Sequence, residues 1–517
     1  MSAPTGQSRR EPGTQQELPR IVRAMAVVER VGNALPHPFW LFWVLSAILA
    51  VISAGLAAAG VSVIGPDGEP VAVRNLLSGD GLAMAVSSMI DNFAEFPPMA
   101  TIVTVIMGVA VAERSGLLAA AMRAGVARVP ASLVVFAVAF AGTVSHVASA
   151  AAYVILVPLG GLAFRAVGRS PILGIVVAYT AIASGYDASP VPTPNDAIFA
   201  GISTAAARIV DPAVVVSPLS NWFFNIASSV VLALVITLMT RLVLSRRPDL
   251  DVDPDAPDDD LHRLALEPAE RSGLRRAGWT LLAFLVLLAA VVLPAWSPLR
   301  GAGGSIVESP LIEGVGAVIA LLFGLLGIVY GTRAGSITSA ADVPKLMTEG
   351  IKQMAPVLAL FFAIAQFLAY FDWSHVGDVL AVVAADGLRT TGIPLPVVFL
   401  MVLAVLTVVN VMVTSGSAMW SIAAPVLIPM LMLVEVPPET TQALFRIADS
   451  GSTAITPMSP YFVMALGFLQ RYRRDAGIGT LASYTLPLAV AMTAVWTLLF
   501  LAWWALGIPL GPGAPVR

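Results

Sequence analysis

The sequence predicts an all-α polytopic membrane protein with an inverted internal repeat. Its 517 residues are 57% hydrophobic and 12% charged, whereas soluble domains are about half apolar and about one quarter charged. Charge-free windows of about 20 residues, the length that a membrane span requires, recur along the chain. A polar segment near the middle separates two hydrophobic halves, as in many secondary transporters. These observations favour about nine or ten spans together with shorter re-entrant pieces.

The composition also excludes several classes of protein. The net charge is −3 and there is no cysteine, so the basic surface of a nucleic-acid-binding protein and thiolate metal sites are both absent. The four histidines do not form an HExxH pair, and no nucleophile elbow or P-loop is present. We therefore expect neither an enzyme nor an ATP-driven pump, and no cofactor other than a bound sodium ion.

The predicted spans follow one another along the chain. The charge-free windows are Pro38–Gly65, Trp222–Thr240, Ala277–Leu299, Gly314–Thr332 and Ala355–Tyr370. Further apolar runs are Met99–Ala112, Ala131–Phe164, Pro171–Gly185 and, as the last span, Leu486–Leu506.

One window is too long to cross the membrane once. Residues Thr390–Val434 contain no Asp, Glu, Lys or Arg, and a straight helix of this length would extend about 68 Å at about 1.5 Å per residue. The chain must therefore turn back inside the membrane. The turn is predicted at Asn410 and the polar run Thr414–Ser417.

The charged segments predict the topology and the division of the chain. Residues 1–36 carry five arginines and lack the apolar core of a signal peptide, so the positive-inside rule places the N-terminus in the cytoplasm. Residues 243–276 contain arginines around an acidic, proline-containing centre, Asp249–Asp260, which predicts a flexible cytoplasmic linker. The first membrane half then covers residues 37–242, and the second covers residues 277–517.

Internal similarity supports two related halves. Ser149–Pro158 aligns without gaps with Gly416–Pro425, and in both an aromatic residue follows a small one by four positions and precedes a proline by five. Each half then has a polar, proline-broken stretch, Ser184–Pro194 or Asp449–Pro457. Unwound backbone is tolerated in hydrocarbon only where protein or water satisfies it. The broken segments therefore predict a central polar site, with close helix packing through small residues as the alternative.

Charged residues beside the second broken stretch are candidates for this site. Arg446 and Asp449 are three residues apart, which places them on one helix face. A charge at membrane depth is usually functional, and guanidinium groups bind carboxylates bidentately. We therefore predict that Arg446 binds a substrate carboxylate and Asp449 the coupling cation. A buried structural ion pair between them is the alternative.

Further polar residues are candidates for ion coupling. Asp196 and Asp187 lie in or after the first broken stretch and could carry a proton or cation, although Asp196 also fits a helix cap behind Thr193–Pro194–Asn195. Asn410 lies where the long window must bend. Its amide oxygen, together with Asp449, suits a sodium ion, because hard cations prefer oxygen ligands.

Two aromatic side chains have more than one interpretation. Trp420 could stack on an aromatic substrate or anchor a helix at the membrane interface. His146 fits a hydrogen-bonded buried histidine or, alternatively, a proton relay.

The motifs together resemble the AbgT family of p-aminobenzoyl-glutamate transporters. The resemblance extends over nearly the whole chain in order. It is carried by Arg30–Phe42, Val111–Leu117, Phe362–Ser374, Ser415–Trp420, Phe445–Ser450, Ile455–Pro457 and Ala476–Thr480.

The resemblance implies a homodimer in the inner membrane of a bacterium. Each protomer would have nine transmembrane helices and two re-entrant hairpins, near residues 131–164 and 397–433. Members of the family are described as importing p-aminobenzoyl-glutamate or exporting sulfonamide antimetabolites, driven by ion gradients. Carried over by position, the family's substrate and ion residues are Asp196, Asn410, Ser417, Trp420, Pro438, Arg446 and Asp449.

This chain departs from the family pattern at four positions. His146 and Ala150 replace an Asn and an Asp in the first hairpin, and Ser189 and Thr453 replace Asn in the broken stretches. Each exchange removes an oxygen suited to sodium, which favours proton coupling through His146 and Asp187. We therefore predict an ion-coupled secondary transporter of aromatic carboxylates. The alternatives are a dicarboxylate or short-chain anion carrier and, in a different class, an ion channel.

Overall fold

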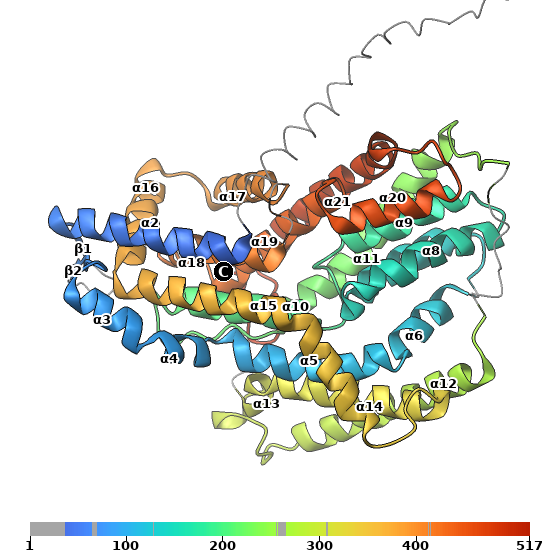
Figure 1. The fold of residues 1–517 in the computed structure, drawn as a ribbon, viewed down its shortest axis with the longest axis horizontal. Coiled ribbons are helices and arrows are strands. Elements are labelled where there is room, and N and C mark those ends of the chain that lie inside the picture. Colours follow the sequence, from blue (N-terminus) through green and yellow to red (C-terminus); the bar gives the residue numbers. More distant parts are fainter. Residues whose placement is uncertain are drawn as a thin grey trace, which may run out of the picture.

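The computed structural model of the chain is built from helices (Figure 1). It describes residues 37–517 except 65–69, 128, 255, 257–264, 307–308, 412 and 414. Within these residues the only sheet is an antiparallel pair of strands, β1 (Ser62–Ile64) and β2 (Pro70–Ala72). The predicted N-terminal segment 1–36 lies outside the described residues.

The helices follow the apolar windows of the sequence. Those of the first half are α2 (Pro38–Ala58), α3 (Gly79–Ser87), α4 (Met89–Ala94), α5 (Pro98–Arg114), α6 (Leu117–Val126), α7 (Val134–Val144), η1 (Ser145–Ala148), α8 (Ala151–Ala166), α9 (Pro171–Ala183), α10 (Pro194–Ala207), α11 (Trp222–Leu242) and η2 (Leu244–Arg246). Those of the second half are α12 (Pro268–Val292), η4 (Ala302–Gly304), α13 (Pro310–Glu313), α14 (Val315–Ala334), α15 (Asp342–Trp373), α16 (Val376–Thr391), α17 (Leu395–Asn410), α18 (Gly416–Met432), α19 (Pro438–Thr453), α20 (Pro460–Gln470) and α21 (Ile478–Leu506).

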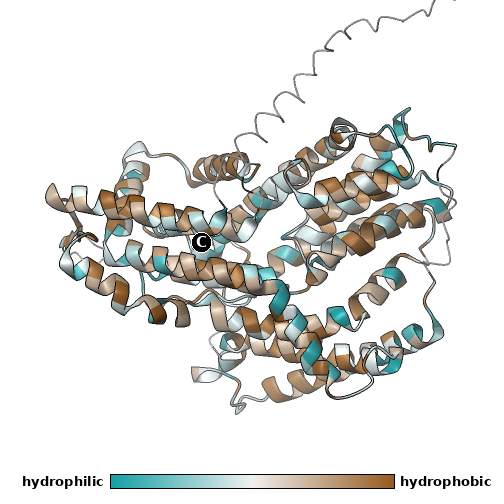
Figure 2. Cartoon of the chain, viewed as in Figure 1, coloured by the Kyte–Doolittle hydropathy of each residue, from teal (hydrophilic) through white to brown (hydrophobic). Residues whose placement is uncertain are grey.

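Seven helical segments of the described chain are long and apolar enough to cross a membrane. They are α2, α4 with α5, α11 with η2, α12, α14, α15 and α21. In Figure 2 the helices are mostly brown and the teal residues gather at their ends, which is the pattern expected when apolar side chains face lipid. The predicted helical membrane fold is confirmed. The count of nine spans stays a prediction. The seven segments would become nine if the pairs α9–α10 and α19–α20 each cross the membrane as one interrupted helix.

Both predicted re-entrant regions contain two short helices joined by a turn. In the first, α7 leads through η1 into α8, and Ser149 at the turn has a φ of 46°. In the second, α17 ends at Asn410 and α18 begins at Gly416, so the predicted turn is confirmed. Arg389, in the last turn of α16, bonds the carbonyl of Leu433, just after α18, so the chain returns to the side from which it entered.

The two halves have opposite orientations relative to the linker. Ser170, between α8 and α9, donates a hydrogen bond to the linker carbonyl of Leu250 (2.8 Å), so the first hairpin opens on the linker side. In the second half it is the far end of α20 that meets the linker, where the N–H of Arg474 donates to Asp253 (2.8 Å). The second hairpin and the start of α19 therefore lie at the opposite face, which we call the distal face.

The first part of the linker is bound to neighbouring helices. Arg247 donates two hydrogen bonds to Asp249 (2.9 Å each) and lies over the ring of Tyr484 in α21 (4.2 Å). The hydroxyl of Tyr484 donates to the carbonyl of Asp249 (2.8 Å), and the N–H of Asp253 donates to the carbonyl of Tyr472 (2.9 Å). For this part the prediction of a flexible linker is wrong, because its acidic side chains and carbonyls meet donors at the ends of α20 and α21. Most of the remaining acidic centre lies outside the described residues.

Candidate functional site

Two interrupted helices face each other in the middle of the protein. The chain leaves helical geometry between α9 and α10 and again between α19 and α20. Prolines in these stretches have no N–H to donate and therefore interrupt the helical hydrogen bonds. The N–H of Asp187, in the first break, donates to the hydroxyl of Ser450 in α19 (3.1 Å). The two broken segments are therefore joined directly, as the predicted central site requires.

An ion pair connects the second interrupted helix to the first. Nη2 of Arg446 in α19 is 2.7 Å from Oδ1 of Asp196 in α10, and the two side chains are 1% and 6% exposed. Nε of Arg446 donates to Oδ1 of Asn221 (3.0 Å), and the guanidinium lies 5.3 Å from the ring centre of Phe199. The cation is thus held by one carboxylate, one amide and one aromatic face, all supplied by the first half of the chain.

The ion pair between Arg446 and Asp449, the alternative interpretation of these two residues, is not formed among the described residues, where Arg446 pairs with Asp196. Side chains on an α-helix lean toward its N-terminus, so Arg446 leans away from Asp449 and reaches α10 instead. Spacing within one helix could not reveal a partner on another helix 250 positions earlier in the sequence.

Asp196 fulfils the helix-capping role and the ionic role together. Its Oδ2 accepts hydrogen bonds from the N–H and hydroxyl of Thr193 (2.6 and 2.8 Å), which completes a capping box at the start of α10. Its Oδ1 accepts from Arg446. Both oxygens of Asp196 therefore accept bonds, one from Arg446 and one from Thr193.

Asp449 lies against the tip of the second hairpin. Gly416, the first residue of α18, has its Cα so close to this carboxylate that a methyl group there would overlap it. Asp449 is buried. The glycine therefore lets the carboxylate reach the hairpin tip.

Asp187 is buried, its carboxylate oxygens accept no hydrogen bond from a fixed donor among the described residues, and it lies within hydrogen-bond reach of the carboxyl group of Asp449, with which it can share a proton. The charged groups that act on it are Asp449, Arg446 and Asp196. The three aspartates and the arginine therefore form one cluster, which we call the central cluster. With all four side chains ionised its charge would be −2. Burying unpaired carboxylates costs several kcal/mol, so the central cluster has a strong physical tendency to take up protons or cations.

Asn410 and Ser417 flank the turn of the second hairpin. The amide of Asn410 is buried, and neither its oxygen nor its nitrogen has a hydrogen-bond partner in the described residues. The hydroxyl of Ser417 is 3.4 Å from that of Ser415, which caps α18. Thr456, in the break after α19, donates to the carbonyl of Val411 (3.0 Å), so this turn contacts the second broken segment.

Trp420 is a core residue of the site. It is fully buried, its ring stacks on Phe445 with centroids 4.5 Å apart, and its indole N–H donates to the hydroxyl of Ser203 (3.0 Å). The interpretation as an interfacial anchor is therefore wrong. Pro438 is the first residue of α19, about 12 Å along the helix from Arg446 at about 1.5 Å per residue. The structure does not bring it to the ion pair.

The four positions that depart from the family pattern lie at the tip of the first hairpin and in the two broken stretches. His146 is buried, and its ring lies against Tyr186 (centroids 5.0 Å apart) and the backbone of Ile182, so its interpretations as a hydrogen-bonded core histidine and as a proton relay both stay predictions. Ala150 precedes α8. The hydroxyls of Ser189 and Thr453 both donate to backbone carbonyls, those of Val191 (2.6 Å) and Asp449 (2.8 Å). Each hydroxyl therefore donates its hydrogen to the backbone and keeps oxygen lone pairs that can accept.

Three neutral residues around Arg446 escaped the sequence analysis. Asn221 accepts from Arg446, and the side-chain amide of Gln442 forms hydrogen bonds with Asn221 (3.0 Å) and Ser203 (2.7 Å). A signal for Gln442 was present, because it lies one turn before Arg446 in a segment with unusually many polar residues for membrane depth. Asn221 and Ser203 carry no such local signal, since their role depends on packing between halves.

Comparison with known proteins identifies the family. The model of the "AbgT putative transporter family" matches residues 23–517. The chain belongs to the AbgT family. This AbgT protein is 40% identical over 488 residues to the p-aminobenzoyl-glutamate transport protein of Escherichia coli K12, covering 94% of this chain and 95% of that one. It is accordingly a membrane transporter and not an enzyme.

Two solved structures of family members share the fold. The Alcanivorax borkumensis YdaH transporter, described as having an unusual topology, aligns with a TM-score of 0.87 at 38% identity, covering 92% of this chain and 100% of that one. Neisseria gonorrhoeae MtrF, described as illuminating a class of antimetabolite efflux pumps, aligns with a TM-score of 0.90 at 36% identity, covering 95% of this chain and 100% of that one.

Proposed function

We propose that this AbgT transporter moves an aromatic carboxylate of the p-aminobenzoyl-glutamate type across the membrane, coupled to cation movement through the central cluster. One observation carries the proposal: a single buried guanidinium, Arg446, lies among three buried carboxylates where both interrupted helices meet. The guanidinium supplies a site for an anion, and the surplus carboxylates supply sites for cations.

Substrate binding would change the partner of Arg446. In the described chain its hydrogen bonds and ion pair use Nε and Nη2, so donors on Nη1 remain for a substrate carboxylate. A substrate carboxylate that also replaces Asp196 as the partner of Nη2 would leave Asp196 unpaired in a buried position. Asp196 would then take up a cation, which links cargo binding to ion binding.

We propose protons rather than sodium as the coupling ion. A hard cation such as sodium is held by several oxygen ligands, and His146 and Ala150 stand where the family carries an amide and a carboxylate oxygen. The described residues leave Asp187 without a hydroxyl or amide partner. A proton needs only one oxygen and therefore suits this carboxylate.

We further propose a homodimer in the bacterial inner membrane with the linker in the cytoplasm. The location is supported by arginines clustered at the linker ends of α11 and α12: Arg241, Arg246, Arg247, Arg271, Arg275 and Arg276. The positive-inside rule places such loops in the cytoplasm. The dimer rests on the family resemblance.

Uptake by reconstituted vesicles tests the proposed function. Radiolabelled p-aminobenzoyl-glutamate should accumulate under an imposed pH gradient, and an equal sodium gradient at constant pH should not replace it. Arg446→Ala should abolish this uptake, whereas Arg471→Ala, at an exposed arginine after α20, should retain it. Uptake unchanged by Arg446→Ala would remove the guanidinium from the site, and sodium-driven accumulation would overturn the choice of ion.

A further inference from the structure

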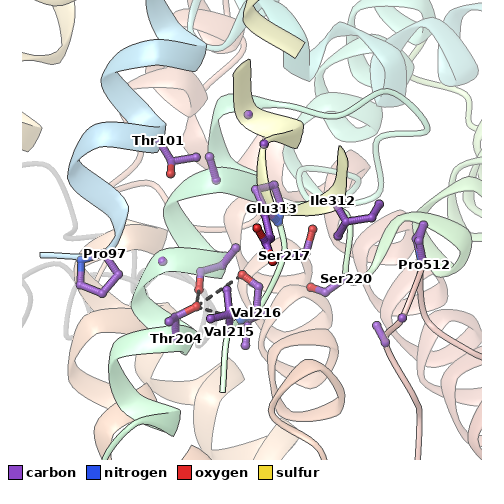
Figure 3. Close-up of a pocket in the computed structure, with 18 of the residues that line it drawn as sticks. Pro97, Thr101, Thr204, Val215, Val216, Ser217, Ser220, Ile312, Glu313 and Pro512 are labelled. Carbon is purple, nitrogen blue, oxygen red and sulfur yellow. Dashed lines mark hydrogen bonds between the residues drawn. The ribbon is translucent and has the colours of Figure 1, made fainter. Parts of the chain in front are cut away.

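A cavity of about 870 Å³ opens at the distal face. Its walls come from α5, α10, the connection between α10 and α11, the α13–α14 corner, and the start of α19. Figure 3 shows Thr101 on α5, Thr204 on α10, and Val215, Ser217 and Ser220 on the connection around this space. We call it the distal cavity. Its volume lies in the range of small-molecule sites, about 300–1,000 Å³.

Two buried polar side chains line the distal cavity. The hydroxyl of Ser220, whose residue is 1% exposed, has no hydrogen-bond partner in the described chain. Glu439 is 9% exposed, and its carboxylate meets its own backbone N–H but no cationic side chain among the described residues. Buried polar groups are nearly always satisfied in folded proteins, so the hydroxyl of Ser220 points to a ligand, and the carboxylate of Glu439 in the same lining can accept further donors.

The floor of the distal cavity is directly connected to the central cluster. Ser220 precedes Asn221, whose Oδ1 accepts from Nε of Arg446 (3.0 Å). Nδ2 of Asn221 donates to the backbone carbonyl of Glu439 (3.0 Å). A ligand on this floor is therefore one residue away from the amide that positions the guanidinium.

The charges around the distal cavity define the chemistry of the ligand. Glu439 and Glu313 bring two carboxylates to its lining, and the exposed Arg208 brings one guanidinium. An inorganic ion would leave most of the volume empty. An organic molecule with an aryl amino group at one end and a carboxylate at the other would fill more of it, with the neutral N–H groups donating hydrogen bonds to Glu439 and the carboxylate lying toward Arg208.

We propose that the distal cavity is a second binding site, which holds an amino-aryl carboxylate with its amino group at Glu439 and Ser220. The identity of the ligand rests on the proposed function, whereas the site itself rests on the cavity. The molecule would occupy this site before or after its passage through the central cluster.

Thiol labelling tests the proposal, because the natural chain has no cysteine. Val215 lines the distal cavity and is 63% exposed, so Val215→Cys introduces the only thiol at its wall. The purified full-length protein in detergent is labelled with a fluorescent maleimide, with and without p-aminobenzoyl-glutamate. At about ten times its Kd, the ligand should slow labelling about tenfold by occupancy.

Matched variants and ligands assign the contact. Glu439→Gln and Ser220→Ala should each raise the ligand concentration needed for protection, the former about tenfold because it removes a charged hydrogen-bond acceptor. Benzoyl-glutamate, which lacks the amino group, should need a similarly higher concentration. Asp386→Asn, at an exposed carboxylate outside this cavity, should leave protection unchanged. Thermal melting of each variant identifies any that fails to fold. If one does, the comparison of p-aminobenzoyl-glutamate with benzoyl-glutamate on the Val215→Cys protein still tests the contact.

Adding Arg446→Gln separates this proposal from the proposed function. Protection should persist with Arg446→Gln even though transport is lost. Three results would overturn the second site. The ligand could fail to protect Val215→Cys, or its protection could disappear with Arg446→Gln. Protection could also stay the same both with Glu439→Gln and with the ligand that lacks the amino group. Transport that survives the loss of Arg446 while protection persists would instead overturn the proposed function alone.

Discussion

The ion pair between Arg446 and Asp196 should be strongly coupled energetically. Removing one partner of a buried pair costs about 3–5 kcal/mol. Asp196→Ala also removes the capping box with Thr193, worth about 1 kcal/mol, but Asp187 and Asp449 remain as substitute partners, so we expect a total of about 4 kcal/mol. Arg446→Met should cost about 4 kcal/mol as well, because it leaves three buried carboxylates. The double variant should cost about 5–6 kcal/mol instead of about 8, a coupling energy of about 2–3 kcal/mol.

Reversible unfolding in mixed micelles titrated with dodecyl sulfate measures this coupling. The free energy of unfolding is determined for the protein, both single variants and the double variant. Asp386 and Arg389 in α16 provide a matched control, since this pair is 3.6 Å apart and about 60% exposed, and exposed pairs contribute about 0–1 kcal/mol. Additive costs at 196 and 446, within about 0.5 kcal/mol, would refute the paired arrangement.

Two further predictions concern the hairpin and the linker. Gly416→Ala should lower the free energy of unfolding by about 1–3 kcal/mol and reduce gradient-driven uptake, because its methyl group would overlap the carboxylate of Asp449. The control variant Gly467→Ala, at a position where nothing lies within 4 Å, should do neither. Equal effects of the two substitutions would contradict the contact between Gly416 and Asp449. Hydrogen bonds from Arg247 hold the pKa of Asp249 below its usual range, so this carboxylate stabilises the protein above its unfolded pKa of about 3.9 and loses that effect as the pH falls through the folded pKa. Asp249→Asn should therefore lower the melting temperature at pH 6 more than at pH 3, and an equal loss at both values would contradict the contact with the linker.

Much of the fold could be predicted because the membrane restricts the chain so strongly. The charge-free stretch Thr390–Val434 had to turn back, and it does so between Asn410 and Gly416. The prolines after Ser184 and Asp449 likewise marked the interrupted helices. The contacts of the linker were not predictable, since the acidic composition of Asp249–Asp260 resembles that of a solvated segment.

The site could be predicted in composition but not in its pairing. A charge in an apolar chain is conspicuous, so Arg446, Asp449, Asp196 and Asp187 were all found. The partner of Arg446 depends on how α19 packs against α10, and spacing within one helix favoured Asp449 instead. The environment of Trp420 could not be predicted for the same reason, because Phe445 and Ser203 approach it from other helices.

The central claim is that the surplus carboxylates of the central cluster couple cargo to protons, and Asp187→Asn tests it most directly. The protein and the variant are reconstituted into vesicles, and labelled p-aminobenzoyl-glutamate is followed with and without a pH gradient. We expect the protein to accumulate cargo above its external concentration when the gradient is imposed. We expect the variant only to equilibrate or exchange it. Accumulation by Asp187→Asn equal to that of the unaltered protein would contradict the account.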